Sequence, residues 1–219
     1  MTDPAIEEGW IAEAVAAEHP ELRLRWIEAH GGTARSSPAL QERLALLSDR
    51  FRGAQAVTMR REPVPHAYRA FFRSVGLDPD ETRTPVEAAA LERLVRGGFA
   101  ARERVADALL LALVETAVPL WAVDAGALDG PLGVREAQRG ERLGRGGYAP
   151  DLAPGRLVVA DAERPVAVLF GAVAASHLPG PATPALRVFT VQVAGVPELH
   201  VEEALWTCAE ALDRDQGRR

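Results

Sequence analysis

Apolar side chains recur at helical spacing through most of the first half of the chain. Near the start, the spacing of one apolar set predicts a helix: Ile6, Trp10, Ile11, Ala14 and Val15. Two further amphipathic helices are predicted over 38–51 and 65–75. Residues 84–87 have threonine first, proline second and glutamate fourth, which is the form of a capping box. We therefore expect a helix that begins there and ends near Gly97.

One predicted helix differs from the others because it is apolar almost all round. It spans about 103–118, and its run from Val105 to Val114 contains one charged residue, Asp107. A helix without a polar face is buried on most of its sides. We therefore expect this helix at the centre of the molecule.

The second half of the chain is typical of strands. Short apolar runs lie at 120–124, 132–134, 157–160, 166–170 and 186–193. An earlier strand is predicted where Leu22, Leu24 and Trp26 alternate with arginines, and a last helix over 201–212. Because strands and helices do not alternate regularly, the pattern predicts an α+β fold with a mixed or antiparallel sheet.

Composition narrows the classes of function. The 219 residues carry a formal net charge of -6 and include no lysine. Non-specific binding to DNA or RNA needs a positive field, so we expect no DNA partner and only local contacts with RNA. No apolar run reaches the roughly 18 residues of a membrane span, and the acidic start does not resemble a secretory signal. These features predict a cytoplasmic protein with no membrane partner.

Several short motifs together carry a resemblance to a known family. They are Tyr68-Arg69, Gly76-Leu77-Asp78-Pro79, Arg83, Glu87-Ala88, Arg93, Val105-Ala106-Asp107, the segment Pro119 to Asp124 and the segment Pro154 to Asp161. In this order and spacing the chain resembles the B3/4 domain, the editing module of the phenylalanyl-tRNA synthetase beta subunit. The resemblance extends over about 11–212. It implies one α+β domain over 1–219, with the sheet packed around the buried central helix.

The resemblance also implies an activity, namely hydrolysis of the ester of a wrongly charged aminoacyl-tRNA. Two polar positions of the family, an asparagine and a serine in the buried helix, correspond here to Leu110 and Leu113. Residues 170–178 also keep few of the family's polar groups. Two interpretations follow: a trans-editing hydrolase that uses a positioned water, or a non-catalytic module. The module would bind a small amino-acid-like molecule or the tRNA acceptor end.

Ester hydrolysis needs a positioned water and donors for the developing oxyanion. Ser176, His177 and Thr183 form the best local cluster for this chemistry, because a histidine accepts a proton near neutral pH. The alternative for His177 is a histidine in a surface loop. Asp107, inside an apolar helix, needs a partner, which is a substrate ammonium, an arginine or a neighbouring backbone group. Asp124 either binds a ligand at the end of a strand or is a turn residue before Gly126.

Glu115 is a third candidate for the substrate ammonium. It lies about 80° around the helix from Asp107, so the two should not form one acid/base pair. Arg139, Arg142 and Arg145 interleave with glycines in a predicted loop over 139–147. That loop either grips the phosphates of a tRNA end or is a solvated hairpin tip.

Nothing in the sequence points to a cofactor. The five histidines lack metal-ligand spacing, and no phosphate-binding Gly-Lys-Ser/Thr loop or Gly-x-Ser-x-Gly elbow is present. We therefore expect no metal, nucleotide or redox cofactor. The single cysteine, Cys208, rules out an intrachain disulfide and a thiolate cluster, and its apolar helical surroundings predict a buried, inert thiol.

Overall fold

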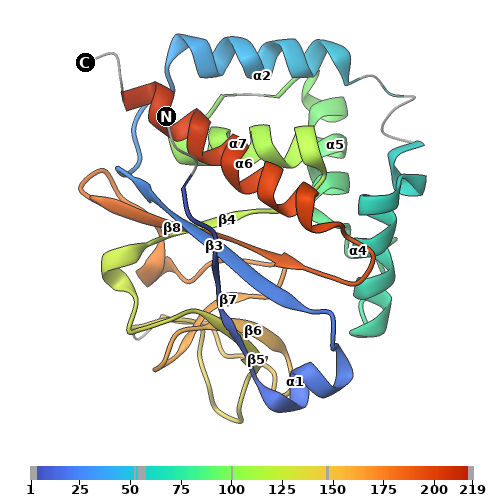
Figure 1. Ribbon diagram of the computed structural model, residues 1–219, viewed down its shortest axis with the longest axis vertical. Helices are drawn as coiled ribbons and strands as arrows, with labels where there is room; N and C mark the ends of the chain where they lie inside the picture. Colours follow the sequence, from blue (N-terminus) through green and yellow to red (C-terminus); the bar gives the residue numbers. More distant parts are fainter. Residues whose placement is uncertain (1–3, 52, 54–57, 100, 147, 217–219) are drawn as a thin grey trace. The chain divides into compact units, whose positions relative to one another are not determined.

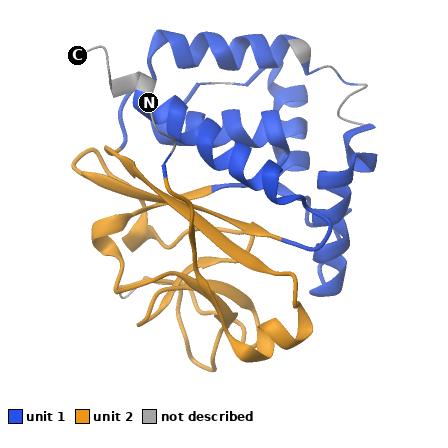
Figure 2. Cartoon of the chain, in the orientation of Figure 1, with its two compact units in different colours: residues 1–4, 33–120, 193–219 blue, residues 5–32, 121–192 orange. Residues whose placement is uncertain are grey.

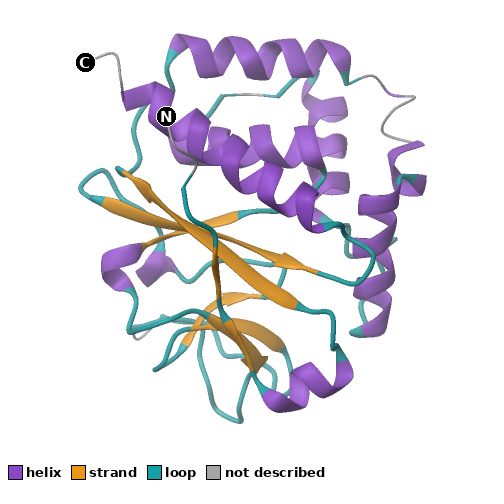
Figure 3. Cartoon of the chain, viewed as in Figure 1, coloured by secondary structure: helices purple, strands orange, loops and turns teal. Residues whose placement is uncertain are grey.

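The computed structural model describes residues 4–51, 53, 58–99, 101–146 and 148–216 (Figure 1). The chain divides into two compact units (Figure 2). The first unit comprises 1–4, 33–120 and 193–219, and the second comprises 5–32 and 121–192. Figure 3 shows that the first unit is helical and that the strands lie in the second. The single domain expected over 1–219 stays a prediction.

The helical unit is built from segments whose ends carry the expected signals. Its elements are α2 (Pro38–Arg50), η1 (Met59–Arg61), α4 (Pro63–Ser74), α5 (Pro85–Arg96), α6 (Arg104–Thr116) and α7 (Glu198–Gln216). The capping box at Thr84 and Glu87 is present, and Gly97 ends α5 in the left-handed conformation that a glycine adopts without strain. The helices predicted over 38–51, 65–75, 84–97 and 103–118 are confirmed. The last helix begins earlier and ends later than the predicted 201–212.

Helix α6 has almost no exposed face. Of its residues, only Glu115 is exposed, and Ala108, Leu111 and Ala112 are fully buried. Within its own unit it packs against α7, α2 and α5. Its first turn is capped by Glu103, whose carboxylate accepts hydrogen bonds from the backbone N–H groups of Val105 and Ala106. The prediction of a helix buried on most sides is confirmed.

The second unit contains two four-stranded sheets. Its elements are β1 (Glu7–Glu8), β2 (Trp10–Ile11), α1 (Glu13–Glu18), β3 (Arg23–His30), β4 (Trp121–Asp124), η2 (Ala125–Ala127), β5 (Gly133–Glu136), β6 (Leu157–Ala160), β7 (Pro165–Val168), η3 (Ala175–His177) and β8 (Ala185–Gln192). One sheet has the order β1-β3-β8-β4 and is antiparallel throughout. The other, β2-β5-β6-β7, is mixed because β2 pairs with β5 in parallel. The predicted α+β class with antiparallel and mixed sheets is confirmed.

The predicted helix near the start is partly wrong. Only Glu13–Glu18 are helical, and the preceding residues form β1 and β2, which join different sheets. The indole of Trp10 lies against Gly133, where an added Cβ would come within 2.0 Å of the ring. This packing requires an extended Trp10 and a glycine at 133. The spacing of apolar residues within a short segment cannot reveal that the segment pairs with β5, which lies far along the chain.

Candidate active site

Ser176 and His177 lie together in η3 and form a hydrogen-bonded pair. The Oγ of Ser176 is 3.0 Å from Nδ1 of His177. The serine is exposed, whereas the imidazole is entirely buried, at 0% exposure. The backbone N–H of Arg145 donates to the same Oγ at 2.9 Å. The pair is therefore a fixed arrangement, and the alternative of a surface histidine at 177 is excluded.

The other face of the imidazole meets a carboxylate. Nε2 of His177 lies 3.9 Å from Oδ2 of Asp161, and both side chains are fully buried. Asp161 is itself fixed, because its oxygens accept hydrogen bonds from the backbone N–H groups of Asp129, Glu163 and Arg164. At 3.9 Å the contact is electrostatic and too long for a hydrogen bond. Nε2 has no hydrogen-bond partner among the described residues.

These surroundings set the protonation state of His177. Burial lowers the pKa of His177 below its ordinary value; the charge of Asp161 opposes this, and Arg145 and Arg164 add to it. The imidazole is therefore neutral at neutral pH. The nearby carboxylate favours the tautomer with its proton on Nε2. In that tautomer Nδ1 accepts a hydrogen bond from the Ser176 hydroxyl. The catalytic roles of Ser176, His177 and Thr183 stay predictions.

Thr183 and Asp124 form a second pair in the same unit. The Thr183 hydroxyl donates to Oδ2 of Asp124 at 2.7 Å and accepts from the Gly180 N–H at 3.0 Å. The other oxygen of Asp124 accepts from the Gly126 N–H at 2.9 Å. Both residues hold the ends of loops in place, and the recorded contacts of Thr183 do not include Ser176 or His177. These hydrogen bonds favour the alternative that Asp124 is a turn residue. Binding of a substrate by Asp124 stays a prediction.

Asp107 and Glu115, in α6, also have partners inside the protein. Oδ2 of Asp107 accepts from the Ser36 hydroxyl at 2.5 Å, and Oδ1 accepts from the Arg102 N–H at 2.9 Å. Glu115 forms an ion pair with Arg43 at 2.7 Å. The partners of Asp107 match the alternative of hydrogen bonds with a neighbouring segment. Binding of a substrate ammonium by either carboxylate stays a prediction.

The three arginines of the predicted loop differ in their contacts. Arg145 pairs with Asp129, Arg142 pairs with Asp151 at 3.2 Å, and Arg139 is exposed. The described part, 139–146, forms a loop with one isolated bridge at Arg142. Gly147, which ends the predicted segment, lies outside the described residues. A role of these arginines in RNA binding stays a prediction.

The motif residues Arg69 and Glu87 form the buried centre of an ion-pair network. Arg69 binds Glu87 and Asp80, each at 2.7 Å. Arg60 also reaches Glu87, at 2.8 Å, and the Thr84 hydroxyl donates to its second oxygen at 2.9 Å. Burial alone would lower the pKa of Arg69, but the hydrogen bonds and charges of Asp80 and Glu87 raise it. The network joins α4 to the start of α5, so these residues shape the fold.

Comparison with known proteins identifies the source of this motif series. The sequence model of the B3/4 domain matches residues 67–178, which is just over half of the chain. The chain belongs to the B3/4 domain family. The matched segment begins two residues before Arg69 and ends one residue after His177, so it contains Arg69, Asp80 and Glu87 of the network and the Ser176–His177 pair.

Two curated relatives of this B3/4 protein are phenylalanine–tRNA ligase beta subunits. They come from Xanthomonas campestris pv. campestris (strain 8004) and Xanthomonas oryzae pv. oryzae (strain MAFF 311018). Each is 38% identical over 94 residues, which cover 42% of this chain and 12% of the relative. The chain thus matches about an eighth of the length of these relatives.

Part of the candidate site could not be predicted from the sequence. Asp161, Asp129 and Arg164 lie near the buried imidazole, and of these the sequence motifs include only Asp161. The available signal was that a buried histidine needs polar neighbours, and Asp161 directly follows a strand. Cys208 is buried as predicted, and burial raises the pKa of its thiol to about 12.

In the part of the chain that the structure describes, no three histidine, cysteine or acidic side chains are placed to hold a metal ion. Over the same residues, no helix combines the length and the apolar character needed to cross a bilayer.

Proposed function

We propose that this B3/4 protein is a trans-editing hydrolase, which cleaves the ester bond of wrongly charged aminoacyl-tRNA in the cytoplasm. The observation that carries the proposal is the contact of 3.0 Å between the exposed hydroxyl of Ser176 and the buried Nδ1 of His177. The relatives named as phenylalanine–tRNA ligase beta subunits support a substrate that contains tRNA. An aminoacyl ester is already activated, so a positioned water and a base are enough for its hydrolysis.

The reaction follows from the arrangement of the pair. A water bound at the Ser176 hydroxyl gives a proton to Oγ, which passes its own proton to Nδ1 of His177. The water oxygen forms a bond to the ester carbonyl carbon. The bond from this carbon to the ribose oxygen then breaks, and the ribose oxygen takes the proton back through Ser176. The products are a free amino acid and an uncharged tRNA.

The hydroxyl is suited to this relay because its other contact is fixed. Arg145 N–H occupies one lone pair of Oγ and holds the oxygen in place, while the second lone pair is left for water. The neutral state of His177 leaves Nδ1 free to accept a proton at neutral pH. On this proposal the exposed Arg139 is free to contact tRNA phosphates, whereas Arg142 and Arg145 would first have to leave Asp151 and Asp129.

A second function is a module that binds an amino-acid-like molecule or the tRNA acceptor end without chemistry. Asp107, Asp124 and Glu115 each have partners within the protein, so a ligand ammonium would have to displace one of these partners in either function. Leu110 and Leu113 are apolar where the family has polar groups, which favours binding over catalysis.

Deacylation of a panel of mischarged tRNAs separates the two functions. The wild-type protein should release the amino acid from at least one tRNA faster than buffer does. His177→Gln should lower this rate by about 100-fold or more, because it removes the base. His66→Gln, at an exposed histidine of α4, is the matched control and should keep the wild-type rate. Thermal melting checks that both variants are folded.

The outcomes are distinct. Release that depends on His177 supports the hydrolase. If no tRNA is deacylated but one or more bind in a filter assay, the binding module is supported instead. If neither release nor binding occurs, both functions are wrong.

A further inference from the structure

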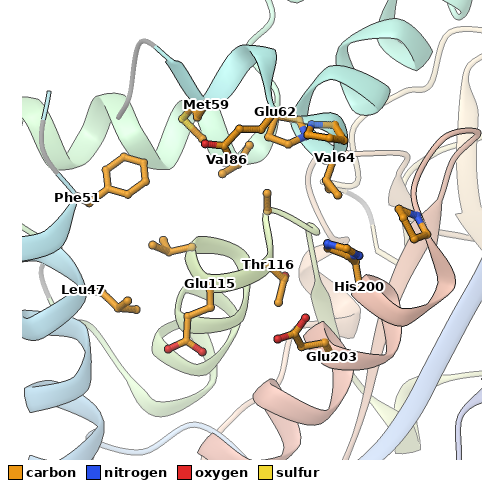
Figure 4. A pocket seen from close by; sticks show the side chains of 15 residues that line it. Leu47, Phe51, Met59, Glu62, Val64, Val86, Glu115, Thr116, His200 and Glu203 are labelled. Carbon is orange, nitrogen blue, oxygen red and sulfur yellow. The ribbon is translucent and has the colours of Figure 1, made fainter. Parts of the chain in front are cut away.

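The helical unit contains a pocket that is separate from Ser176 and His177. Its volume is about 790 Å³, within the range of roughly 300–1,000 Å³ that is usual for small-molecule sites. All of its lining residues belong to this unit (Figure 4). Its apolar wall comes from α2, η1, α4, α5 and α6 and includes Leu47, Met59, Val64, Val86 and Val114. Phe51 adds an aromatic ring that a flat apolar group can contact.

The polar groups of this pocket are predominantly acidic. Glu62, Glu115 and Glu203 line it, and no arginine or lysine does so among the described residues. The charge of Glu115 is neutralised by Arg43 at 2.7 Å. The structure records no ion pair of Glu62 or Glu203 with any described residue. The charges of these two carboxylates are therefore not balanced by a basic side chain among the described residues.

One end of the pocket presents several polar groups together. His200 and Glu203 are three residues apart on α7, so they project from the same side of the helix. Figure 4 shows both side chains directed toward the pocket, with Thr116 from the end of α6 beside them. Glu203 is exposed and His200 half-buried, whereas Met59, Val64 and Val86 opposite are buried. The pocket thus combines a buried apolar wall with an acidic rim that is exposed to solvent.

We propose that this pocket binds a small organic cation, an amine carried on an apolar or aromatic body. The apolar body would cover the wall formed by residues such as Met59 and Val86, and the ammonium would lie near Glu203. A carboxylate on the ligand would be repelled by the same acidic rim. The pocket should therefore prefer a simple amine to a free amino acid, and a free amino acid to an organic acid. The site does not depend on the hydrolase, since it shares no residue with the Ser176–His177 pair.

Three probes with the same aromatic body test the charge preference. They are 2-phenylethylamine, phenylalanine and 3-phenylpropanoate, titrated into the full chain at neutral pH and low salt, with amide chemical shifts as the readout. The amine should shift residues of the pocket and saturate, and phenylalanine should bind less tightly. The acid should bind at least about tenfold more weakly than the amine, a difference of about 1.4 kcal/mol. Equal affinities for the three probes, or no binding of the amine, would overturn the proposal.

Two variants of one helix give the matched test. Glu203→Gln removes a charge at the rim and should weaken amine binding by about two- to fivefold, the range for an exposed ion pair. Glu202→Gln makes the same change of net charge at the neighbouring position, which does not line the pocket, and should leave the affinity unchanged. If both variants weaken binding equally, the attraction comes from net charge alone and the site is wrong. Leu47→Trp, checked for folding by melting, should fill the pocket and abolish binding.

Discussion

The Arg69 network and the Ser176–His177 pair are both polar groupings with buried members, but they differ in how far the hydrogen bonds of those buried members are satisfied. In the network, Arg69 and Asp80 bind directly and both oxygens of Glu87 are occupied. In the pair, Nε2 of His177 has no hydrogen-bond partner among the described residues. Buried polar groups are nearly always satisfied in folded proteins. A satisfied network is explained by the fold, whereas the unpaired Nε2 of His177 leaves the role of the pair to be tested.

The comparison changes how the family motif is interpreted. The residues that carry most of the early resemblance, such as Arg69 and Glu87, hold α4 and α5 together. They therefore have a structural role in this unit. The Ser176–His177 pair lies in a short 3-10 helix near the end of the matched segment, and it is the arrangement that the proposed hydrolase would use.

The largest effect is expected from breaking the network. Glu87→Ala leaves the guanidinium of Arg69 with Asp80 as its one acidic partner among the described residues and removes the capping box of α5. Removing one partner of a buried pair costs about 3–5 kcal/mol of the free energy of unfolding. Urea unfolding measures this loss. Glu92→Ala, on the same helix but in exposed ion pairs, should cost about 1 kcal/mol or less. Equal losses would show that the network is no more important than surface pairs.

A smaller effect is expected from the pH dependence of His177. Because burial lowers its pKa, the unfolded chain binds a proton at higher pH than the folded protein does. Its contribution to stability is therefore complete above about pH 6.5 and is lost as the pH falls from there toward the folded pKa. The slope cannot exceed one proton, about 1.4 kcal/mol per pH unit. Histidines usually titrate between about pH 5 and 8, and urea unfolding across this range measures the slope of the free energy of unfolding against pH. His177→Gln should have a shallower slope than the wild type.

The matched control for this slope is again His66→Gln, at an exposed histidine. It should unfold with the wild-type pH dependence. If His177→Gln has the wild-type slope as well, the folded protein does not hold this imidazole neutral, and the assignment of a base at 177 fails.

The smallest effect is expected from Asp80 at the edge of the network. The hydrogen bond from Arg69 lowers the pKa of Asp80; partial burial opposes this, and the charges of Arg69 and Arg60 reinforce it. Its contribution to stability is therefore present above the ordinary aspartate pKa of about 3.9 and is lost as the pH falls through the lower folded value. Asp80→Asn should reduce the loss of stability on acidification. Asp78→Asn, which has no arginine partner among the described residues, should not, and unfolding in acid measures both.

Much of the fold could be predicted because its signals are local. Proline and threonine at the start of α5, glycine after its end and the all-round apolar α6 each report on their own segment. The short strands near the N-terminus could not be predicted this way. Trp10 is extended because it pairs with β5, far along the chain, and helical spacing of apolar residues cannot reveal such a partner.

The candidate site was predicted less completely, for the same reason. Ser176 and His177 are neighbours in sequence, so their pairing was visible. Asp161 reaches His177 only through the folding of the sheet unit, and nothing in the local sequence joins the two. The pocket of the helical unit was missed although His200 and Glu203 share one face of the last helix. Its apolar wall comes from five other elements, which spacing along one helix does not reveal.

The central claim is that Ser176 serves chemistry and not the fold, and its most direct test measures stability and deacylation in one variant. Ser176→Ala removes an exposed hydroxyl, so its free energy of unfolding should stay within about 1 kcal/mol of the wild type. Its rate of amino acid release from the best mischarged tRNA should fall by about 100-fold, while Ser74→Ala, at another exposed serine, keeps the wild-type rate. A stable Ser176→Ala protein that releases the amino acid as fast as the wild type would contradict the account.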